Sequence, residues 1–293
     1  MWRHRFRLNL FLSCLAFLLL LSIIAAAILV VVASGPLAQG DGWLASANVS
    51  NTEGSSYHPR IAVDAQDRLH MVWYDWVDLE VHWPYILYAS KPADGEWTSY
   101  SYLPGNAQGS MPALAVGADG AVHVVWEGQG ICYVRRDSSG TWSAVEDVST
   151  FGSMPDVAVA PDGTVHVTWW HREDYPHDAH MYHCDRSSGG GWSAPVSVYS
   201  GENASTPLIA TDTEGTAHLL INATGYEIQA MCASKPVGGG WSTPQEMWFA
   251  PLPLSVEQLA SDSQRRLHLA WGWQDVGSGQ WGVNYASKAL SQS

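Results

Sequence analysis

Three acidic residues, Asp75, Asp156 and Glu173, are candidates for acid–base chemistry. Glycoside hydrolysis needs two carboxyl groups roughly 5 to 10 Å apart, one to protonate the leaving group and one to act as nucleophile or base. These residues lie in or beside the segments that differ most between the repeats described below. We take them as candidate catalytic residues, with ordinary solvated surface carboxylates as the alternative.

Histidines are concentrated between residues 171 and 183, with three carboxylates among them. Imidazole nitrogens and carboxylate oxygens are common ligands of transition metals. However, an extended strand turns His180 and His183 to opposite faces, and no compact metal-binding motif is present. His171, His177 and His180 are the candidate ligands if a metal binds, but we expect neither a metal nor another cofactor.

The elements that must position these residues are repeated five times. Four of the five repeats begin with proline, and all five contain a histidine inside an apolar strand. Aligned on that histidine, they read PRIAVDAQDRLHMVWY, PALAVGADGAVHVVWE, PDVAVAPDGTVHVTWW, PLIATDTEGTAHLLIN and EQLASDSQRRLHLAWG. A second pair of short strands around a Gly-Trp turn follows each of the first four, so a unit of roughly 50 residues matches a four-stranded propeller blade. We predict an all-β, five-bladed β-propeller of four-stranded antiparallel blades over residues 41–293.

The last repeat stops before its Gly-Trp turn and final strand. Residues 40–50 (GDGWLASANVS) resemble this missing part, with Trp43 at the position of the turn tryptophan in the other units. A strand from the N-terminus would complete the last sheet and protect its edge. We therefore expect the N-terminal strand to close the ring.

The turn at residues 135–142 (RRDSSGTW) resembles the Asp-box of the BNR repeats in sialidase-like propellers, keeping Asp137, Thr141 and Trp142. The resemblance extends loosely over residues 41–290 and implies the propeller fold. It also implies a mechanism in which three arginines hold the substrate carboxylate and a tyrosine acts as nucleophile with an acidic partner. Arg60 and Arg172 match two of these arginines, while the other arginines of the repeats fall near the opposite hairpins.

The five repeated histidines are interpreted as scaffold, because a single site on a ring must break the symmetry of the ring. A buried neutral imidazole both donates and accepts, so it can link strands or loops without leaving a polar atom unpaired. The repeated tryptophans are assigned to packing. The histidines are His70, His123, His166, His218 and His268.

Function is expected where the repeats disagree. One register of the innermost strand reads Arg60, Ala113, Asp156, Leu208 and Gln258, and the loops of repeats 1, 3 and 5 are long and rich in aromatic and acidic residues. Such loops on a rigid scaffold are typical of binding sites. The candidate ligand-binding residues are Arg60, Asp75, Trp76, Asp156, Arg172, Glu173, Gln258, Trp273 and Asp275.

A formal net charge of −14 disfavours nucleic acid and other polyanions as partners. Carboxylates beside aromatic rings suit a glycan or another small polar ligand, because rings cover sugar faces and carboxylates accept hydroxyl hydrogen bonds. We predict a carbohydrate-binding propeller. The alternatives are a sialidase-like or other glycoside hydrolase, and a scaffold that binds a protein partner.

The N-terminal 40 residues form a separate segment. Arg3, Arg5 and Arg7 precede a run of uncharged, mainly apolar residues at 10–32, which at about 1.5 Å per residue is long enough to cross a bilayer as a helix. The arginines predict a cytoplasmic N-terminus and a membrane-anchored propeller on the extracytoplasmic side. Cleavage near Ala33 or Ser34 would instead release a secreted protein.

Overall fold

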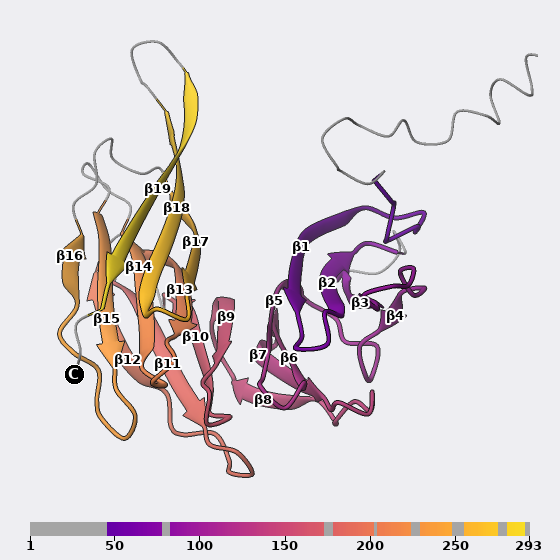
Figure 1. Cartoon of the computed structure of the whole chain (residues 1–293), viewed down its shortest axis with the longest axis horizontal. Helices are drawn as coiled ribbons and strands as arrows, with labels where there is room; N and C mark the ends of the chain where they lie inside the picture. The colour runs from indigo at the N-terminus through magenta and orange to yellow at the C-terminus, as the bar shows by residue number, and fades with distance from the viewer. Residues whose placement is uncertain are drawn as a thin grey trace, which may run out of the picture. The chain divides into compact units, whose positions relative to one another are not determined.

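The computed structural model describes residues 46–77, 83–172, 178–201, 204–223, 229–247, 255–274 and 280–290. Every helix or strand assigned within these ranges is a β strand, and the strands form five antiparallel sheets in chain order (Figure 1). This confirms the prediction of an all-β, five-bladed propeller. The same ranges hold no helix of the length and apolar character that crossing a membrane requires, and the predicted segment at 10–32 lies outside them.

Each blade is a meander of consecutive strands. The first contains β1 (Ser56–Val63), β2 (Leu69–Asp75), β3 (Tyr85–Lys91) and β4 (Ser101–Tyr102), and the second contains β5 (Ser110–Val116), β6 (Val122–Gly128), β7 (Gly130–Arg136) and β8 (Glu146–Ser149). The third contains β9 (Ser153–Val159), β10 (Val165–His171), β11 (Ala179–Arg186) and β12 (Val196–Gly201), and the fourth contains β13 (Ala204–Thr211), β14 (Ala217–Ala223), β15 (Gln229–Lys235) and β16 (Gln245–Met247). The fifth contains three described strands, β17 (Ser255–Ser261), β18 (Arg266–Gln274) and β19 (Trp281–Ala289).

The first strands of successive blades lie side by side, β1 beside β5, β5 beside β9, β9 beside β13 and β13 beside β17. In four of these strands, the residue before a proline has a positive φ. Residues other than glycine seldom adopt this conformation, and the pairing with the second strand of the blade shifts register at each site. The four residues are His58 (φ 49°), Met111 (φ 50°), Met154 (φ 51°) and Thr206 (φ 28°).

The repeated histidines link the second and third strands of their own blades. His123 Nδ1 lies 2.8 Å from the Tyr133 hydroxyl, and burial lowers the pKa of His123 to about 4, which keeps the ring neutral. A neutral ring and a hydroxyl satisfy each other without placing a charge in the core. The corresponding pairs are His70 with Tyr88, His166 with His183, His218 with Ser234 and His268 with Tyr285.

The turn tryptophans pack between blades, as predicted. Trp142 of the second blade meets Tyr88 of the first edge-on, with ring centroids 5.1 Å apart, and Trp192 of the third meets Tyr133 of the second at 5.0 Å. The third and fourth blades repeat the contact through His183 and Trp241 at 4.9 Å. Such aromatic contacts add specific geometry to the apolar burial between blades.

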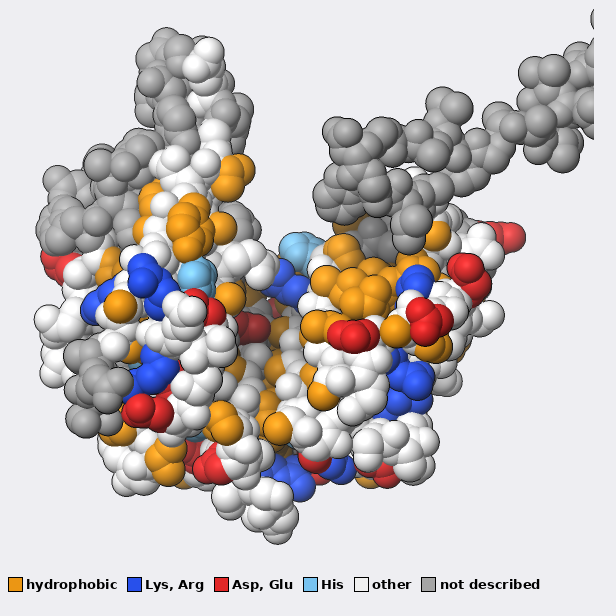
Figure 2. Space-filling view, in the orientation of Figure 1, with side chains coloured by type: hydrophobic (Ala, Val, Ile, Leu, Met, Phe, Trp, Pro, Cys, Tyr) orange, Lys and Arg blue, Asp and Glu red, His pale blue; other side chains and the backbone are white. Residues whose placement is uncertain are grey.

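The first and last blades expose faces that are buried elsewhere. Val283 and Tyr285 on β19 are 82% and 63% exposed, whereas their counterparts in the second blade, Ile131 and Tyr133, are 0% and 1% exposed. On β1, Ile61 and Val63 are also exposed. Figure 2 shows hydrophobic surface on both blades, on either side of a hollow.

The predicted N-terminal strand at residues 40–50 is not formed over its described part. Residues 46–50 form no strand. Val49 instead packs against Trp73, Leu87 and Ala89 of the first blade, which offers it an apolar cluster. Residues 40–45, including Trp43, lie outside the described residues.

Candidate functional site

The inner strands of four blades surround a pocket of about 280 Å³. It opens where the strands shift register, so the residues with positive φ and the prolines after them form much of its wall. The lining residues are His58, Arg60, Met111, Pro112, Met154, Pro155, Asp156, Thr206, Pro207, Leu208 and Asn222. The structure therefore brings together Arg60 and Asp156, which the sequence placed at one register of the inner strand.

Asp156 is the carboxylic acid of this pocket. The Ile209 backbone N–H donates to its Oδ2 at 2.8 Å. Burial raises the pKa of Asp156 to about 6, although that hydrogen bond and the positive charge of Arg60 both act to lower it. A carboxyl group with this pKa exchanges protons near neutral pH and can donate or accept a hydrogen bond.

The pocket wall is held by polar contacts behind it. The Met154 N–H donates to Glu127 Oε2 at 3.2 Å, which ties the second blade to the shifted strand of the third. In the fourth blade, the buried Asn222 side chain donates from Nδ2 to the Thr206 carbonyl at 3.2 Å. These bonds satisfy backbone groups that the register shift removes from the sheet.

Aromatic rings stand next to the pocket on the first blade. Tyr74 stacks on His58 with centroids 5.6 Å apart and on Tyr57 with centroids 5.5 Å apart. Tyr57 is 48% exposed. The three rings form an aromatic surface beside Arg60, and we refer to His58, Tyr57 and Tyr74 as the ring stack.

Asp75, a predicted catalytic and binding residue, does not line the pocket. It is fully buried, and the hydroxyls of Thr52 and Ser56 donate to its Oδ2 at 2.7 Å and 2.5 Å. A carboxylate closed off in this way cannot reach a glycosidic bond. Its contacts hold residues 52–56 against the end of β2, and the candidate catalytic residues Asp75 and Asp156 do not line the same pocket.

Of the remaining predicted binding residues, those whose side chains the structure describes do not line this pocket. Arg172 extends over the Trp170 ring, with its guanidinium carbon 5.9 Å from the ring centroid. Gln258 is exposed on β17, and Trp76 is half-buried just after β2. Glu173 and Asp275 lie outside the described residues, as does the side chain of Trp273.

The candidate metal ligands on the third blade do not converge in its described part. His171 packs on the Phe151 ring at 4.7 Å, and His180 Nδ1 lies 3.3 Å from the Ser197 hydroxyl. His177 lies outside the described residues. Among the described residues, one group of histidine and carboxylate side chains brings its ligand atoms close together. This group consists of His166, His183 and Asp185.

The sequence reasoning missed His58, Tyr57, Tyr74 and Asn222. A signal for His58 was available, because its place before the inner-strand proline is held by methionine or threonine in blades 2 to 4. His58 lies two positions before Arg60, and comparing the repeats at that position shows the histidine as a departure from the pattern. Nothing comparable marks Tyr74, which joins the site only through its stacking contact.

Comparisons with known proteins establish the fold. No family model and no curated protein matches the chain. A Dyadobacter fermentans protein of unknown function has a similar structure, with a TM-score of 0.58 and 13% identity over 81% of this chain and 79% of that one.

Two enzyme structures are also similar. One is a Penicillium chrysogenum alpha-L-arabinanase complexed with arabinobiose, with a TM-score of 0.55 and 12% identity over 77% of this chain and 80% of that one. The other is an ulvan lyase with a bound saccharide, with a TM-score of 0.54 and 11% identity over 78% of this chain and 66% of that one. At such low identity, these similarities show a shared fold alone.

Proposed function

We propose that the chain binds a carbohydrate in the pocket between its inner strands. The observation that carries this proposal is the convergence of Arg60 and Asp156, from the first and third blades, on one pocket. The repeats do not require these residues, since the second blade has alanine and the fourth has leucine at the same register. A guanidinium and a carboxyl group together supply donors and acceptors for neighbouring sugar hydroxyls.

The ring stack supports the same proposal. Aromatic faces pack against the C–H faces of sugar rings, and a half-exposed tyrosine beside a polar pocket offers such a face. Tyr57 provides the accessible ring, while Tyr74 holds it in place from behind. The bound saccharide structures of the two similar enzymes make a glycan the first ligand class to test.

The test is a glycan array probed with the full-length chain, followed by titration of the best glycan. Arg60→Gln and Asp156→Asn each remove a charged hydrogen-bonding group, worth about 1.5 to 3 kcal/mol, so each should weaken binding by about tenfold or more. Arg68→Gln, at a half-buried hairpin residue that does not line the pocket, is the matched control and should bind as the wild type does. A folded wild type that binds no glycan would contradict the proposal and favour a protein partner.

A glycoside hydrolase is the second candidate, favoured by the raised pKa of Asp156. A carboxyl group that keeps its proton near pH 6 suits the general acid that protonates a leaving group. Release of new reducing ends from the bound glycan, lost in Asp156→Asn while binding persists, would establish it. The sialidase-like version has less support, because Arg172 does not join Arg60 in the pocket.

We also propose that residues 10–32 anchor the propeller on the extracytoplasmic side of a membrane. The apolar run and the three preceding arginines support this orientation. Full-length protein in cells should remain with membranes after alkaline carbonate extraction, and externally added protease should degrade the propeller. Recovery of the chain in the soluble fraction at its full length would contradict anchoring.

The exposed faces of the first and last blades support a further proposal, that these blades meet through an N-terminal strand that includes Trp43. Trp43→Ala in the full-length chain should then lower the thermal midpoint, because the seam would lose an aromatic contact of the kind that Trp142 and Trp192 make. An unchanged midpoint would argue against this closure.

A further inference from the structure

The third blade departs from the other blades at two positions around its repeated histidine. In blades 1, 2 and 5 the histidine faces a tyrosine hydroxyl, but in blade 3 His166 faces His183. The residue directly across the ladder from the histidine is serine or arginine in the other blades and Asp185 in this one. Both departures therefore meet at His166.

The three side chains share one face of the sheet. Asp185 is the cross-strand partner of His166, and His183 precedes Asp185 by two residues on β11. Residues two apart on a strand point to the same side. Their ligand atoms, one from each residue, all lie within 4.8 Å of one another.

The distance between the two imidazoles suits adjacent ligands of one metal ion. His166 Nδ1 lies 3.1 Å from His183 Nε2. With metal–nitrogen bonds of about 2.1 Å, this separation corresponds to an N–metal–N angle of about 95°. Both rings are buried.

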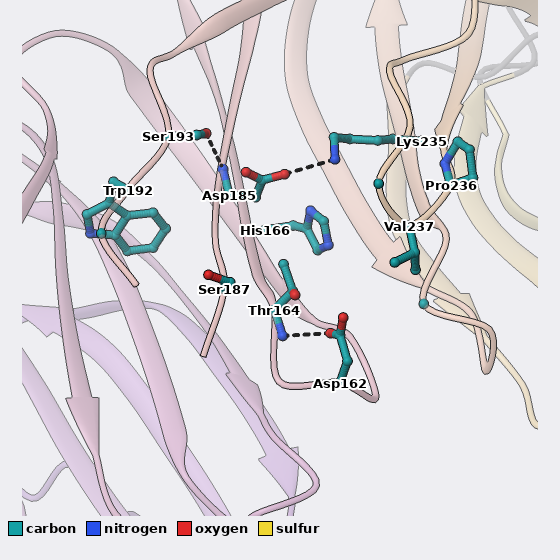
Figure 3. Close-up of a pocket in the computed structure, with 13 residues that line it drawn as sticks. Asp162, Thr164, His166, Asp185, Ser187, Trp192, Ser193, Lys235, Pro236 and Val237 are labelled. Atoms are coloured by element: carbon teal, nitrogen blue, oxygen red, sulfur yellow. Dashed lines mark hydrogen bonds and ion pairs between the residues drawn. The ribbon is translucent and has the colours of Figure 1, made fainter. Parts of the chain in front are cut away.

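Two of the three side chains line a pocket, whereas His183 is not part of its lining. His166 and Asp185 line a pocket of about 380 Å³ between the third and fourth blades. Figure 3 shows Lys235 of the fourth blade reaching Asp185, with Nζ 2.9 Å from Oδ2. The Trp241 ring packs edge-on against His183. Lys235 neutralises the charge of the Asp185 carboxylate, and a bound metal cation would neutralise the same charge.

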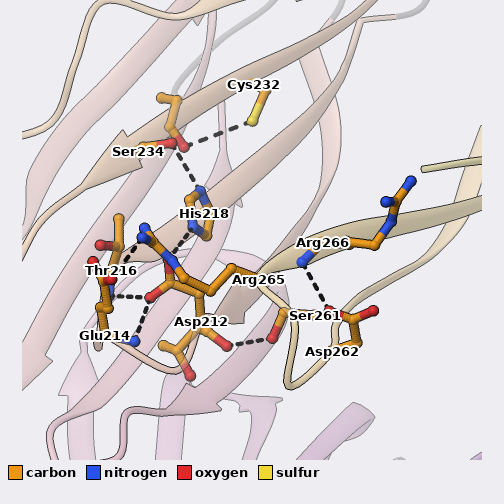
Figure 4. Close-up of polar contacts among 12 residues, drawn as sticks. Asp212, Glu214, Thr216, His218, Cys232, Ser234, Ser261, Asp262, Arg265 and Arg266 are labelled. Atoms are coloured by element: carbon orange, nitrogen blue, oxygen red, sulfur yellow. Dashed lines mark hydrogen bonds and ion pairs between the residues drawn. The ribbon is translucent and has the colours of Figure 1, made fainter. Parts of the chain in front are cut away.

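The fourth blade shows what a purely structural arrangement looks like. His218 lies 2.8 Å from the Ser234 hydroxyl and 3.4 Å from Asp212 Oδ2 (Figure 4). Asp212 also accepts two backbone N–H groups and pairs with Arg265 of the fifth blade at 3.2 Å. Its carboxylate is therefore committed to holding a hairpin and a neighbouring blade together.

We propose that His166, His183 and Asp185 bind a divalent transition-metal ion such as Zn²⁺. Two imidazoles and one carboxylate form a ligand set found in zinc sites and in other transition-metal sites. Three protein ligands leave further coordination positions for water or a ligand in the pocket. This site is separate from the proposed carbohydrate pocket and does not depend on it.

The test is isothermal titration of the metal-free, full-length chain with ZnCl₂. Two variants borrow residues from the other blades and should therefore fold: His183→Tyr restores the histidine–tyrosine pair, and Asp185→Ser restores the cross-strand serine. We expect one Zn²⁺ per wild-type chain, an affinity at least about 100-fold lower in His183→Tyr and at least about tenfold lower in Asp185→Ser.

His171→Ala and His180→Ala are the control variants, since these histidines lie outside the converging group, and both should bind Zn²⁺ as the wild type does. Replacing Zn²⁺ with Co²⁺ adds a direct readout, because its visible absorption reports nitrogen and oxygen coordination. A wild type that binds no Zn²⁺, or a His183→Tyr variant that binds it as tightly as the wild type, would overturn the proposal.

Discussion

The second and third blades are built alike but differ in what they present to solvent. Their central tryptophans, Trp126 and Trp169, are almost completely buried, and each blade receives a tryptophan from the next one. At the inner strand, however, Ala113 in the second blade corresponds to Asp156 in the third. At the histidine pair, Tyr133 corresponds to His183.

Within one repeat, the residues that pack between blades and the residues that could bind a ligand therefore occupy different positions. The buried side chains between blades repeat because every interface has the same geometry. Positions that face the pocket or the outer hairpins carry no such requirement, and at both places the third blade has residues capable of binding.

The largest expected effect concerns the shared scaffold. Trp126→Ala and Trp169→Ala each remove a buried tryptophan from an equivalent position and should each lower the free energy of unfolding by about 3 to 5 kcal/mol. Urea denaturation of both variants measures this. A loss in one blade more than about 2 kcal/mol larger than in the other would show that the two interfaces are not equivalent.

Acid should destabilise both blades through their histidines. The pKa values of His123 and His166 are about 4 in the folded protein, below the unfolded value of about 6.5. Between these values the unfolded chain binds more protons, so stability is present above pH 6.5 and falls as the pH drops toward 4. Denaturation from pH 7 to pH 4.5 should show this loss, and His123→Gln should reduce it.

Asp156→Asn changes a pocket residue and should raise the free energy of unfolding at neutral pH, whereas the tryptophan substitutions in the shared scaffold should lower it. Because the folded pKa of about 6 exceeds the unfolded value of about 3.8, ionising Asp156 costs stability as the pH rises from 4 to 6. The variant should gain about 1 to 3 kcal/mol of unfolding free energy at pH 7 and little at pH 4. An equal gain at both pH values would mean that burial does not raise the pKa of Asp156.

The last prediction concerns zinc binding rather than stability, and it copies the metal-binding group into the second blade. Tyr133→His with Arg135→Asp places histidine and aspartate opposite His123, as in the third blade. The exchange removes the exposed ion pair of Arg135 with Asp119, worth about 0 to 1 kcal/mol. Zinc stoichiometry should rise from one to two, whereas Tyr133→His alone should leave it at one.

The candidate site was predictable only in part. Arg60 and Asp156 stand out because the inner-strand register changes from repeat to repeat, and the structure places both in one pocket. Asp75 looks like an equally good candidate in the sequence, but Thr52 and Ser56 enclose its carboxylate. The repeat pattern does not show that residues 52–56, which precede Asp75 by about 20 positions, cover the end of β2.

The fold class, the number of blades and the packing role of the recurring tryptophans follow from the repeats alone, because a periodic sequence must bury the same kind of surface in every unit. Which of the residues that differ between repeats lie close together in space can be seen only in the tertiary structure. His183 and Asp185 become candidate ligands because the pairing of β10 with β11 places them beside His166. Tyr74 joins the candidate site because its ring stacks on His58. Convergence of side chains depends on strand register and backbone geometry, which local sequence does not specify.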